Sequence, residues 1–450
     1  MDAALLPGGD DTIVAEATAA GRAAIAVIRV SGARATDVAR ALGASALASR
    51  RPARVRLRHP ESGEALDDAL VTWFAAPHSY TGEDVVEFST HGGRVAPARV
   101  LAACLAAGAR QAYPGEFTRR AVVHGKLDLL QAEAVADLID ARTSALQRQA
   151  LAQLDGGLSR RLLALREAVL ELEALIAYDV DFPEEDDGPI DRSRIAAAAG
   201  ALRAQLSALV RTAPTGAMLR DGALVVLAGA PNAGKSSLFN ALLGESRAIV
   251  TPIPGTTRDA IEAVLDRTPI PLRLVDTAGL RETDDALEQL GIEVSVRYLA
   301  QAQVVLACGV SPDEVAATIT AVTPLTGAAV LPVLTKTDLR RVPAGDCSAV
   351  SAETGEGLAA LLVQIDAAVG GAAPSASDEV LVTRERHRIG LATALEEITA
   401  FEAAWRDGAL PATVVAVHLH AARVALEELI GTVDVEDVLG RVFASFCIGK

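Results

Sequence analysis

Eight residues near the middle of the chain have the types and spacing of a phosphate-binding loop. Gly229-Ala-Pro-Asn-Ala-Gly-Lys-Ser236 matches G-x-x-x-x-G-K-[ST], and it lies between an apolar run and a helix-forming run, as this motif requires. Backbone N–H groups in such a loop surround phosphate oxygens, the lysine neutralises their charge and the hydroxyl ligates Mg²⁺. The motif predicts a nucleotide site with Lys235 on the phosphates and Ser236 on the metal.

Three further motifs follow in the order expected of a guanine-nucleotide site. Asp276-Thr-Ala-Gly279 puts a carboxylate near the metal and a glycine N–H near the γ-phosphate. In Thr335-Lys-Thr-Asp338, the aspartate can accept from N1–H and the exocyclic amine of guanine, whereas adenine presents an acceptor at N1. Ser351-Ala352 resembles the loop that offers a backbone N–H to guanine O6. Each motif alone also fits an ordinary turn, but four in order predict GTP as the substrate.

Two positions depart from the usual GTPase pattern. Thr335 stands where most GTPases have asparagine. Because threonine lacks the amide that ties the base loop to the phosphate loop, we expect weaker nucleotide affinity. Leu280 stands where Ras-like enzymes have a glutamine that orients water. Another polar group must do this, and the acidic segment 281–288 either supplies it or is a solvated loop.

Lysine is rare in this chain and marks the same motifs. It occurs only at Lys126, Lys235, Lys336 and Lys450, and every other cationic side chain is arginine. An ammonium is a compact point charge and a guanidinium is a planar fork, so such a chain is expected to keep lysine where only lysine serves. Two of the four lie in the nucleotide motifs, and we expect the other two to lie in binding segments as well.

Composition limits the other classes of function. Half of the 450 residues are apolar, enough for sizeable cores and about three domains. The net charge of -16 argues against binding nucleic acid by bulk electrostatics, so any RNA contact must be local or shared with a basic partner. The cysteines lack metal-binding spacing and fit a reducing compartment. Without a signal peptide or a long apolar span, we expect a cytoplasmic protein with no membrane partner.

Periodicity divides the chain into segments of different type. Residues 1–120 alternate apolar and polar in short runs, typical of a small α+β domain. Apolar residues three and four apart predict long helices over 121–216 and again over 375–450. Strand-like and helical runs alternate over 217–374, which predicts a parallel sheet covered by helices. The predicted fold class is a multidomain α/β and α+β protein: an N-terminal α+β domain, then a helical domain interrupted by an inserted Ras-like P-loop GTPase domain, whose ends must lie close together.

Longer segments resemble one known family. The run Ile249-Val-Thr-Pro-Ile-Pro-Gly-Thr-Thr-Arg-Asp259, followed by Asp276-Thr-Ala-Gly-Leu-Arg281, is similar to the tRNA-modification GTPase MnmE (TrmE) family. Similar segments outside the nucleotide domain are Tyr80-Thr-Gly-Glu-Asp-Val-Val-Glu87 with His91-Gly-Gly93, Pro114-Gly-Glu-Phe-Thr-Arg-Arg120 with Lys126-Leu-Asp-Leu-Leu-Gln-Ala-Glu133, and the terminal Cys447-Ile-Gly-Lys450. The resemblance spans the whole chain, and a C-terminal Cys-x-Gly-Lys behind an inserted G domain is highly specific.

The resemblance implies roles at the GTP site. Glu288 matches the family's water-activating acid, and Thr257 matches a second Mg²⁺ ligand beside Ser236. A K⁺ ion is expected to supply the charge that an arginine finger supplies elsewhere, and its implied ligands are Asn232, Thr251, Ile253 and Thr256. The motifs and the resemblance together assign GTP contacts to Asn232, Ala233, Gly234, Lys235, Ser236, Ser237, Thr251, Pro252, Ile253, Pro254, Gly255, Thr256, Thr257, Asp276, Thr277, Ala278, Gly279, Thr335, Lys336, Thr337, Asp338, Ser351, Ala352 and Glu353.

The resemblance also implies a folate site, held by Arg29, Glu87, Lys126 and Lys450. The cofactor would be a tetrahydrofolate derivative, either 5-formyl- or methylene-tetrahydrofolate. A pterin hydrogen-bonds to a carboxylate, and a glutamate tail suits cations, so the residue types fit. Without the resemblance, Arg29 and Glu87 are ordinary strand charges.

The implied function is a K⁺-stimulated GTPase that acts with an MnmG-type FAD protein. The pair would modify C5 of the wobble uridine of certain tRNAs to an aminomethyl-type group, and the N-terminal domain would form a homodimer. A rival hypothesis is a regulatory GTPase, such as a ribosome-assembly factor, which would have no folate site. Cys447 is either a nucleophile or a packed residue, and arginines 50, 51, 54, 56 and 58 form either a solvated edge or a contact with tRNA or a partner.

Overall fold

The computed structural model shows two compact units. One comprises Met1–Ala136, Gln153–Glu167 and Arg423–Lys450, and the other Asp137–Ala152 and Ala168–Ala422. The residues that the structure describes are 11–19, 21–141, 143–181, 192–245, 248–249, 261–267, 270–276, 296–339, 345–370, 381–431 and 449.

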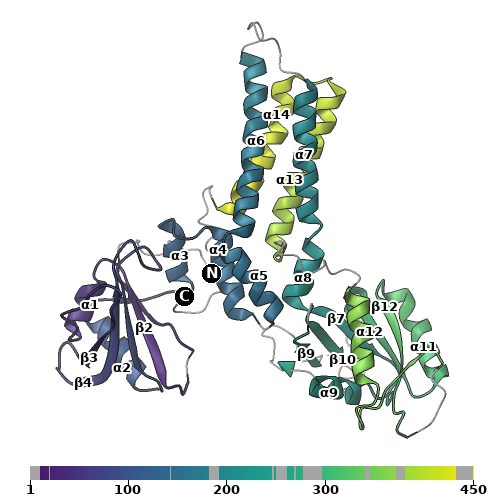
Figure 1. The fold of residues 1–450 in the computed structure, drawn as a ribbon, viewed down its shortest axis with the longest axis horizontal. Coiled ribbons are helices and arrows are strands. Elements are labelled where there is room, and N and C mark those ends of the chain that lie inside the picture. The colour runs from purple at the N-terminus through teal and green to yellow at the C-terminus, as the bar shows by residue number, and fades with distance from the viewer. Residues whose placement is uncertain are drawn as a thin grey trace, which may run out of the picture. The chain divides into compact units, whose positions relative to one another are not determined.

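The N-terminal part of the chain folds into a six-stranded sheet with helices (Figure 1). The strand order is β3-β4-β5-β2-β1-β6, antiparallel except for the β1–β6 pair. The strands are β1 (Ile13–Glu16), β2 (Ile25–Ser31), β3 (Ala53–Arg58), β4 (Ala65–Phe74), β5 (Val85–His91) and β6 (Arg110–Gln111), and the helices are α1 (Ala35–Ala41), α2 (Ala96–Ala106) and α3 (Glu116–Val123).

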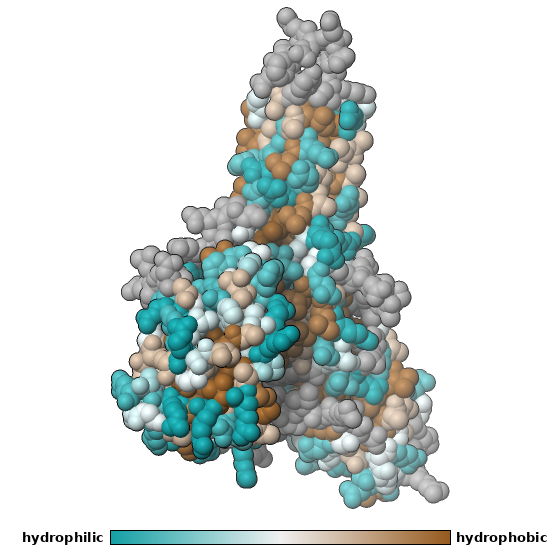
Figure 2. Space-filling model, turned by 60° about the vertical axis from the view of Figure 1, so that its left-hand side comes forward, coloured by the Kyte–Doolittle hydropathy of each residue, from teal (hydrophilic) through white to brown (hydrophobic). Residues whose placement is uncertain are grey.

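Alternation along the strands separates a core face of this sheet from a polar face. On β2, Ile28 and Val30 are fully buried and pack with α1 and α2, while Arg29 between them is partly exposed. Arg29 pairs in register with Glu87 of β5. On the edge strand β3 the arginines predicted as a basic run are exposed, with Arg54 78% exposed, and hydrophilic residues gather on the surface of this domain (Figure 2).

Long helices follow, as the periodicity predicts. They are α4 (Leu129–Asp140), α5 (Ser144–Leu154), α6 (Gly157–Asp181), α7 (Arg192–Val210), α13 (Glu385–Asp407) and α14 (Ala412–Ile430). Helices α6, α7, α13 and α14 lie side by side (Figure 1). Ion pairs join neighbours in this group, as between Arg203 of α7 and Glu402 of α13 at 2.6 Å. Residues from both halves of the chain therefore build one helical domain.

A seven-stranded sheet lies between the two helical segments in sequence. Its order is β13-β12-β11-β7-β10-β9-β8, with β13 to β10 parallel and β9 and β8 antiparallel. Its strands are β7 (Ala223–Ala228), β8 (Ala248–Ile249), β9 (Ile261–Leu265), β10 (Leu272–Asp276), β11 (Val304–Gly309), β12 (Ala329–Leu334) and β13 (Ser348–Ala349), and its helices are α9 (Lys235–Glu245), α11 (Pro312–Val322), the short 3₁₀ helix η2 (Thr323–Leu325) and α12 (Leu358–Gly370).

Helices cover both faces of this sheet. Residues of α9 and α12 pack on one face, and residues of α11 pack with Leu299 on the other. Strands β7 and β11 are buried along their whole length, as expected for parallel strands covered on both sides. Ligands of such sheets bind at the carboxyl ends of the strands, and every predicted nucleotide motif begins at one of those ends.

The two connections to the inserted domain lie next to each other, as expected for an insertion. The Val382 N–H donates to Thr212 Oγ1 at 3.1 Å, and a Cβ at Gly216 would lie 2.0 Å from the carbonyl oxygen of Val382. Helix α8 (Ala213–Asp221) runs through the place where the sequence pattern changes. Pro214 lies in the first turn of α8, where a missing N–H costs nothing, so it starts this helix and does not end one.

No helix within the described part of the chain is both long enough and apolar enough to cross a membrane.

Candidate functional site

The phosphate-loop motif forms a tight turn between β7 and α9. Asn232 and Gly234 adopt left-handed conformations, with φ of 64° and 81°, which turn successive N–H groups toward one side. A Cβ at Gly229 would lie 2.4 Å from the Cys308 carbonyl oxygen of β11, so only glycine fits. Burial raises the pKa of the Cys308 thiol to about 12, so this thiol stays neutral.

Lys235 and Ser236 stand at the start of α9, where the predicted phosphates and metal would bind. The Lys235 ammonium is 5% exposed and donates to the carbonyl oxygens of Gly229 at 3.0 Å and Ala230 at 2.9 Å. The Ser236 hydroxyl donates to Asp276 Oδ2 at 2.6 Å. A hydroxyl and a carboxylate so placed fit Mg²⁺, which binds few protein oxygens and completes its shell with water and substrate phosphates.

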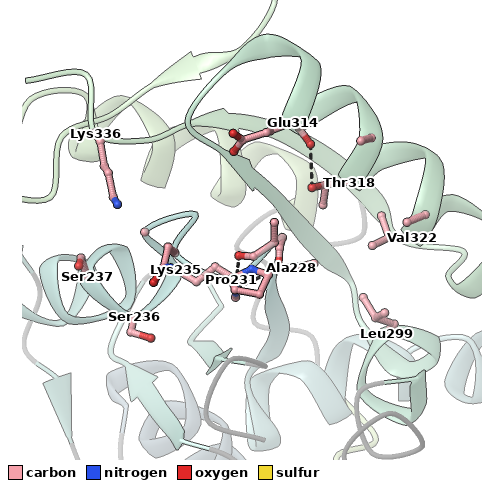
Figure 3. A pocket seen from close by; sticks show the side chains of 16 residues that line it. Ala228, Pro231, Lys235, Ser236, Ser237, Leu299, Glu314, Thr318, Val322 and Lys336 are labelled. Carbon is pink, nitrogen blue, oxygen red and sulfur yellow. Dashed lines mark hydrogen bonds between the residues drawn. The ribbon is translucent and has the colours of Figure 1, made fainter. Parts of the chain in front are cut away.

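A cavity of about 850 Å³ opens over this loop (Figure 3). Its other wall is α11, which contributes Glu314, Thr318 and Val322, and Leu299 closes one end. Lys336 extends toward the phosphate loop from the neighbouring strand end (Figure 3). The described residues contain no group of three or more His, Cys, Asp or Glu side chains that could bind a metal without help from a substrate.

The predicted base-reading residues also come together. The Ser351 hydroxyl donates to Asp338 Oδ1 at 2.7 Å and accepts from the Thr354 N–H at 3.2 Å. Lys336 has a left-handed φ of 56°, which bends the chain sharply between β12 and Asp338. Ser351 therefore holds the aspartate carboxylate in one orientation, and sequence reasoning had assigned only a backbone role to this residue.

The expectation for Thr335 is wrong in its structural premise. Threonine was expected to leave the base loop untied from the phosphate loop, but its hydroxyl donates to the Ala233 carbonyl oxygen at 2.7 Å. The same hydroxyl lies 3.2 Å from the Gly309 carbonyl oxygen of β11. A hydroxyl thus makes the connection for which an amide was thought necessary.

A second cluster of predicted residues lies on the polar face of the N-terminal sheet. Arg29 Nε donates to Glu87 Oε1 at 2.9 Å. The Arg29 guanidinium also lies over two rings, 5.5 Å from the centroid of Tyr80 and 5.7 Å from that of Phe117. The Tyr80 hydroxyl is bonded to Thr118 Oγ1 at 2.8 Å. Sequence reasoning missed both aromatic residues, although each lies in a segment that carries the family resemblance.

The other predicted folate residues lie in this same unit. Lys126 Nζ donates to the Pro77 carbonyl oxygen at 3.1 Å, at one end of the loop that carries Tyr80. A Cβ at Gly449 would lie 2.2 Å from the Glu16 carbonyl oxygen of β1, the strand that pairs with Arg29's strand. The residue before the predicted Lys450 is therefore packed against β1.

Buried charges support α3 next to this cluster. Arg120 donates to Glu116, to Asp11 and to Glu83 within 3.2 Å, and Arg110 donates to Glu116 at 2.7 Å. Burial would raise the pKa of Glu116, but hydrogen bonds from Arg110, Tyr113 N–H and Arg120 outweigh it and hold this pKa below its usual value. The carboxylate stays ionised and keeps the first turn of α3 in place.

Several predicted site residues lie outside the described residues: Thr251, Pro252, Ile253, Pro254, Gly255, Thr256, Thr257, Thr277, Ala278, Gly279, Glu288, Cys447 and Lys450.

Two descriptions of known families match the chain. Residues 12–126 match the GTP-binding protein TrmE N-terminus, and residues 129–447 match the MnmE helical domain.

Relatives match over almost the full length. The tRNA modification GTPase MnmE of Azoarcus sp. (strain BH72) is 43% identical over 455 residues, covering 99% of this chain and 99% of the relative. The tRNA modification GTPase MnmE of Methylorubrum populi is 45% identical over 450 residues, with 99% of each covered. Among solved structures, the G domain of the T. maritima FeoB iron transporter is 25% identical, covering 33% of this chain and 98% of that chain with a TM-score of 0.27.

Proposed function

The chain belongs to the MnmE (TrmE) family of tRNA modification GTPases, and we propose that its GTP hydrolysis drives modification of tRNA. The substrate atom would be C5 of the wobble uridine, converted to an aminomethyl-type group. An MnmG-type FAD protein would be the partner, a tetrahydrofolate derivative the one-carbon donor, and a homodimer the working form. An enzyme acting on tRNA in this way would work in the cytoplasm.

The arrangement of four loops at the ends of adjacent parallel strands is the observation that carries this proposal. Lys235 and Ser236 start α9 at the end of β7, and Asp276 ends the neighbouring β10 within hydrogen-bonding distance of Ser236. Asp338 follows β12 with its carboxylate oriented by Ser351. A phosphate site and a carboxylate suited to guanine therefore occupy one edge of one sheet.

The residues present fit the two implied cations. Ser236, with Thr257, would ligate Mg²⁺, with Asp276 beside it. Bound Mg²⁺ would stabilise the charge on the β- and γ-phosphates. Asn232, with Thr251, Ile253 and Thr256, would bind K⁺. The Asn232 side-chain oxygen has no hydrogen-bond donor among the described residues, and its left-handed backbone places it on the exposed side of the loop.

The cluster around Arg29 fits an anionic, hydrogen-bonding ligand such as a folate. Within the described residues, neither terminal amino group of Arg29 has a protein acceptor, and Glu87 Oε2 has no donor. Tyr80 and Phe117 hold the guanidinium in place, so donors and an acceptor are presented with little loss of side-chain entropy. With Lys126 and Lys450, these residues would bind the pterin and the tail.

Loss of the protein from its cells should change the wobble nucleosides of tRNA. We expect the aminomethyl-type uridine to disappear from digests of total tRNA, as measured by mass spectrometry, and to return when the gene is restored. Restoration with Asp338→Asn should not bring it back if GTP hydrolysis is required. An unchanged nucleoside profile would refute the proposed tRNA modification.

Replacement of Arg29 by glutamine should weaken folate binding at least tenfold. Glutamine keeps an amide donor but loses the charge and the fork geometry that suit a carboxylate. Calorimetry with 5-formyl-tetrahydrofolate and the full-length protein measures the dissociation constant.

Arg99→Gln is the matched control, because Arg99 lies in the same domain, in a surface ion pair with Glu64 at 2.7 Å. This variant should bind folate as the unmodified protein does. If the unmodified protein gives no binding heat, the folate site is wrong and a purely regulatory GTPase becomes the better hypothesis.

A further inference from the structure

Thr335 connects three elements beneath the nucleotide pocket. It follows β12, its N–H donates to the Gly309 carbonyl oxygen of β11 at 2.9 Å, and its hydroxyl donates to Ala233 of the phosphate loop at 2.7 Å. We propose that Thr335 is a positioning residue that sets the height of the phosphate loop relative to the guanine-reading loop, and that this site is built to the reach of a hydroxyl. The inference rests on the proposed guanine-nucleotide site.

The hydroxyl has one proton, and geometry decides where it goes. Ala233 O is 2.7 Å away, an ordinary O–H···O distance, whereas Gly309 O is 3.2 Å away and already accepts the Thr335 N–H. The hydroxyl hydrogen bond therefore belongs to the phosphate loop. Thr335 is 4% exposed and Ala233 1%, so little water can replace that bond.

The space around Thr335 is filled on the side of the phosphate loop. A Cβ at Gly234 would lie 3.2 Å from Thr335 Oγ1 and 3.3 Å from Thr335 Cβ. It would also lie 3.6 Å from Cε of Lys336, so the stem of that lysine covers the same glycine. Residues 335 and 336 thus form the floor on which Gly234 and the start of α9 rest.

An asparagine at this position would not fit the same spacing. Its amide nitrogen lies one covalent bond, about 1.3 Å, farther from the backbone than the hydroxyl oxygen of threonine. With Ala233 O already at hydrogen-bonding distance from that oxygen, the amide would collide with the loop or push it outward. The residue that most GTPases carry should therefore impair this protein.

Three substitutions of Thr335 test the proposal in the full-length chain. Thr335→Ser keeps the hydroxyl and should bind GDP within about threefold of the unmodified protein. Thr335→Val removes it with little change of shape and should weaken GDP binding about tenfold, as expected for one buried hydrogen bond. Thr335→Asn should weaken it at least threefold. Calorimetry with GDP and Mg²⁺ measures all three, beside the melting temperature without nucleotide.

Thr320→Val is the matched control, because the exposed Thr320 hydroxyl on α11 donates to Ala316 O at 2.9 Å, away from the loop. GDP binding should not change in this variant. Equal binding by Thr335→Val and the unmodified protein would overturn the inference, as would tighter binding by Thr335→Asn. If Thr335→Val fails to fold, the Ser and Asn variants still decide. Failure of the unmodified protein to bind GDP would instead remove the proposed function.

Discussion

Replacement of Asp338 by asparagine is expected to change the preferred nucleotide from GTP to xanthosine triphosphate. The carboxylate can accept two hydrogen bonds from guanine, from N1–H and from the exocyclic amine, whereas a carboxamide offers one acceptor and one donor. Charge-assisted hydrogen bonds contribute about 1.5–3 kcal/mol each, so GTP affinity should fall at least about a hundredfold. Xanthine replaces the amine with a carbonyl oxygen, which matches the amide donor.

The structure explains why this exchange should be clean. Ser351 bonds one carboxylate oxygen of Asp338, and a hydroxyl can donate to or accept from the amide that replaces it, so the side chain should keep its orientation. Competition between the two nucleotides, measured by displacement of a fluorescent GDP analogue, gives the result. Asp346→Asn makes the same charge change at an exposed position of the domain and should leave the GTP preference intact. A persistent GTP preference in Asp338→Asn would show that another residue reads the base.

The architecture of the inserted domain could be predicted because its strands are buried on both faces. The apolar run at 223–228 coincides with β7, since a strand covered on both sides needs no polar alternation. Helix α8 was missed for a related reason. Pro214 and Gly216 suggest a break in the chain, but proline is well placed in a first helical turn, and Gly216 is required by the close approach of Val382.

The candidate sites were predictable as residue types and not as contacts. The phosphate-loop spacing identifies Lys235 and Ser236 because backbone geometry fixes their roles locally. Thr335 was misjudged because its partner, Ala233, is 102 residues away in sequence and is a backbone carbonyl, which no pattern of side chains reveals. The rings around Arg29 escaped notice because ordinary core packing also explains a tyrosine and a phenylalanine.

Exchange of Glu288 for alanine is expected to lower GTP turnover about a hundredfold or more, with GTP affinity within about twofold. Positioning or deprotonating the attacking water contributes roughly 10²–10⁴ to the rate, whereas the triphosphate itself is bound by other groups. Turnover is measured by phosphate release at saturating GTP in potassium chloride. The unmodified protein should be slower in sodium chloride, where the proposed K⁺ charge is missing.

The described residues offer one competitor for this role. Glu314 is the only carboxylate among the described residues that line the cavity, and its Oε2 accepts from the Val310 N–H at 3.0 Å. Asp276 is 1% exposed and bonded to Ser236. Both carboxylates thus serve structural or metal-related hydrogen bonds, and the water must be activated by a group from elsewhere. Glu314→Gln, which keeps an acceptor for Val310, should hydrolyse GTP within about threefold of the unmodified protein. Normal turnover in Glu288→Ala with a large loss in Glu314→Gln would transfer the role to Glu314.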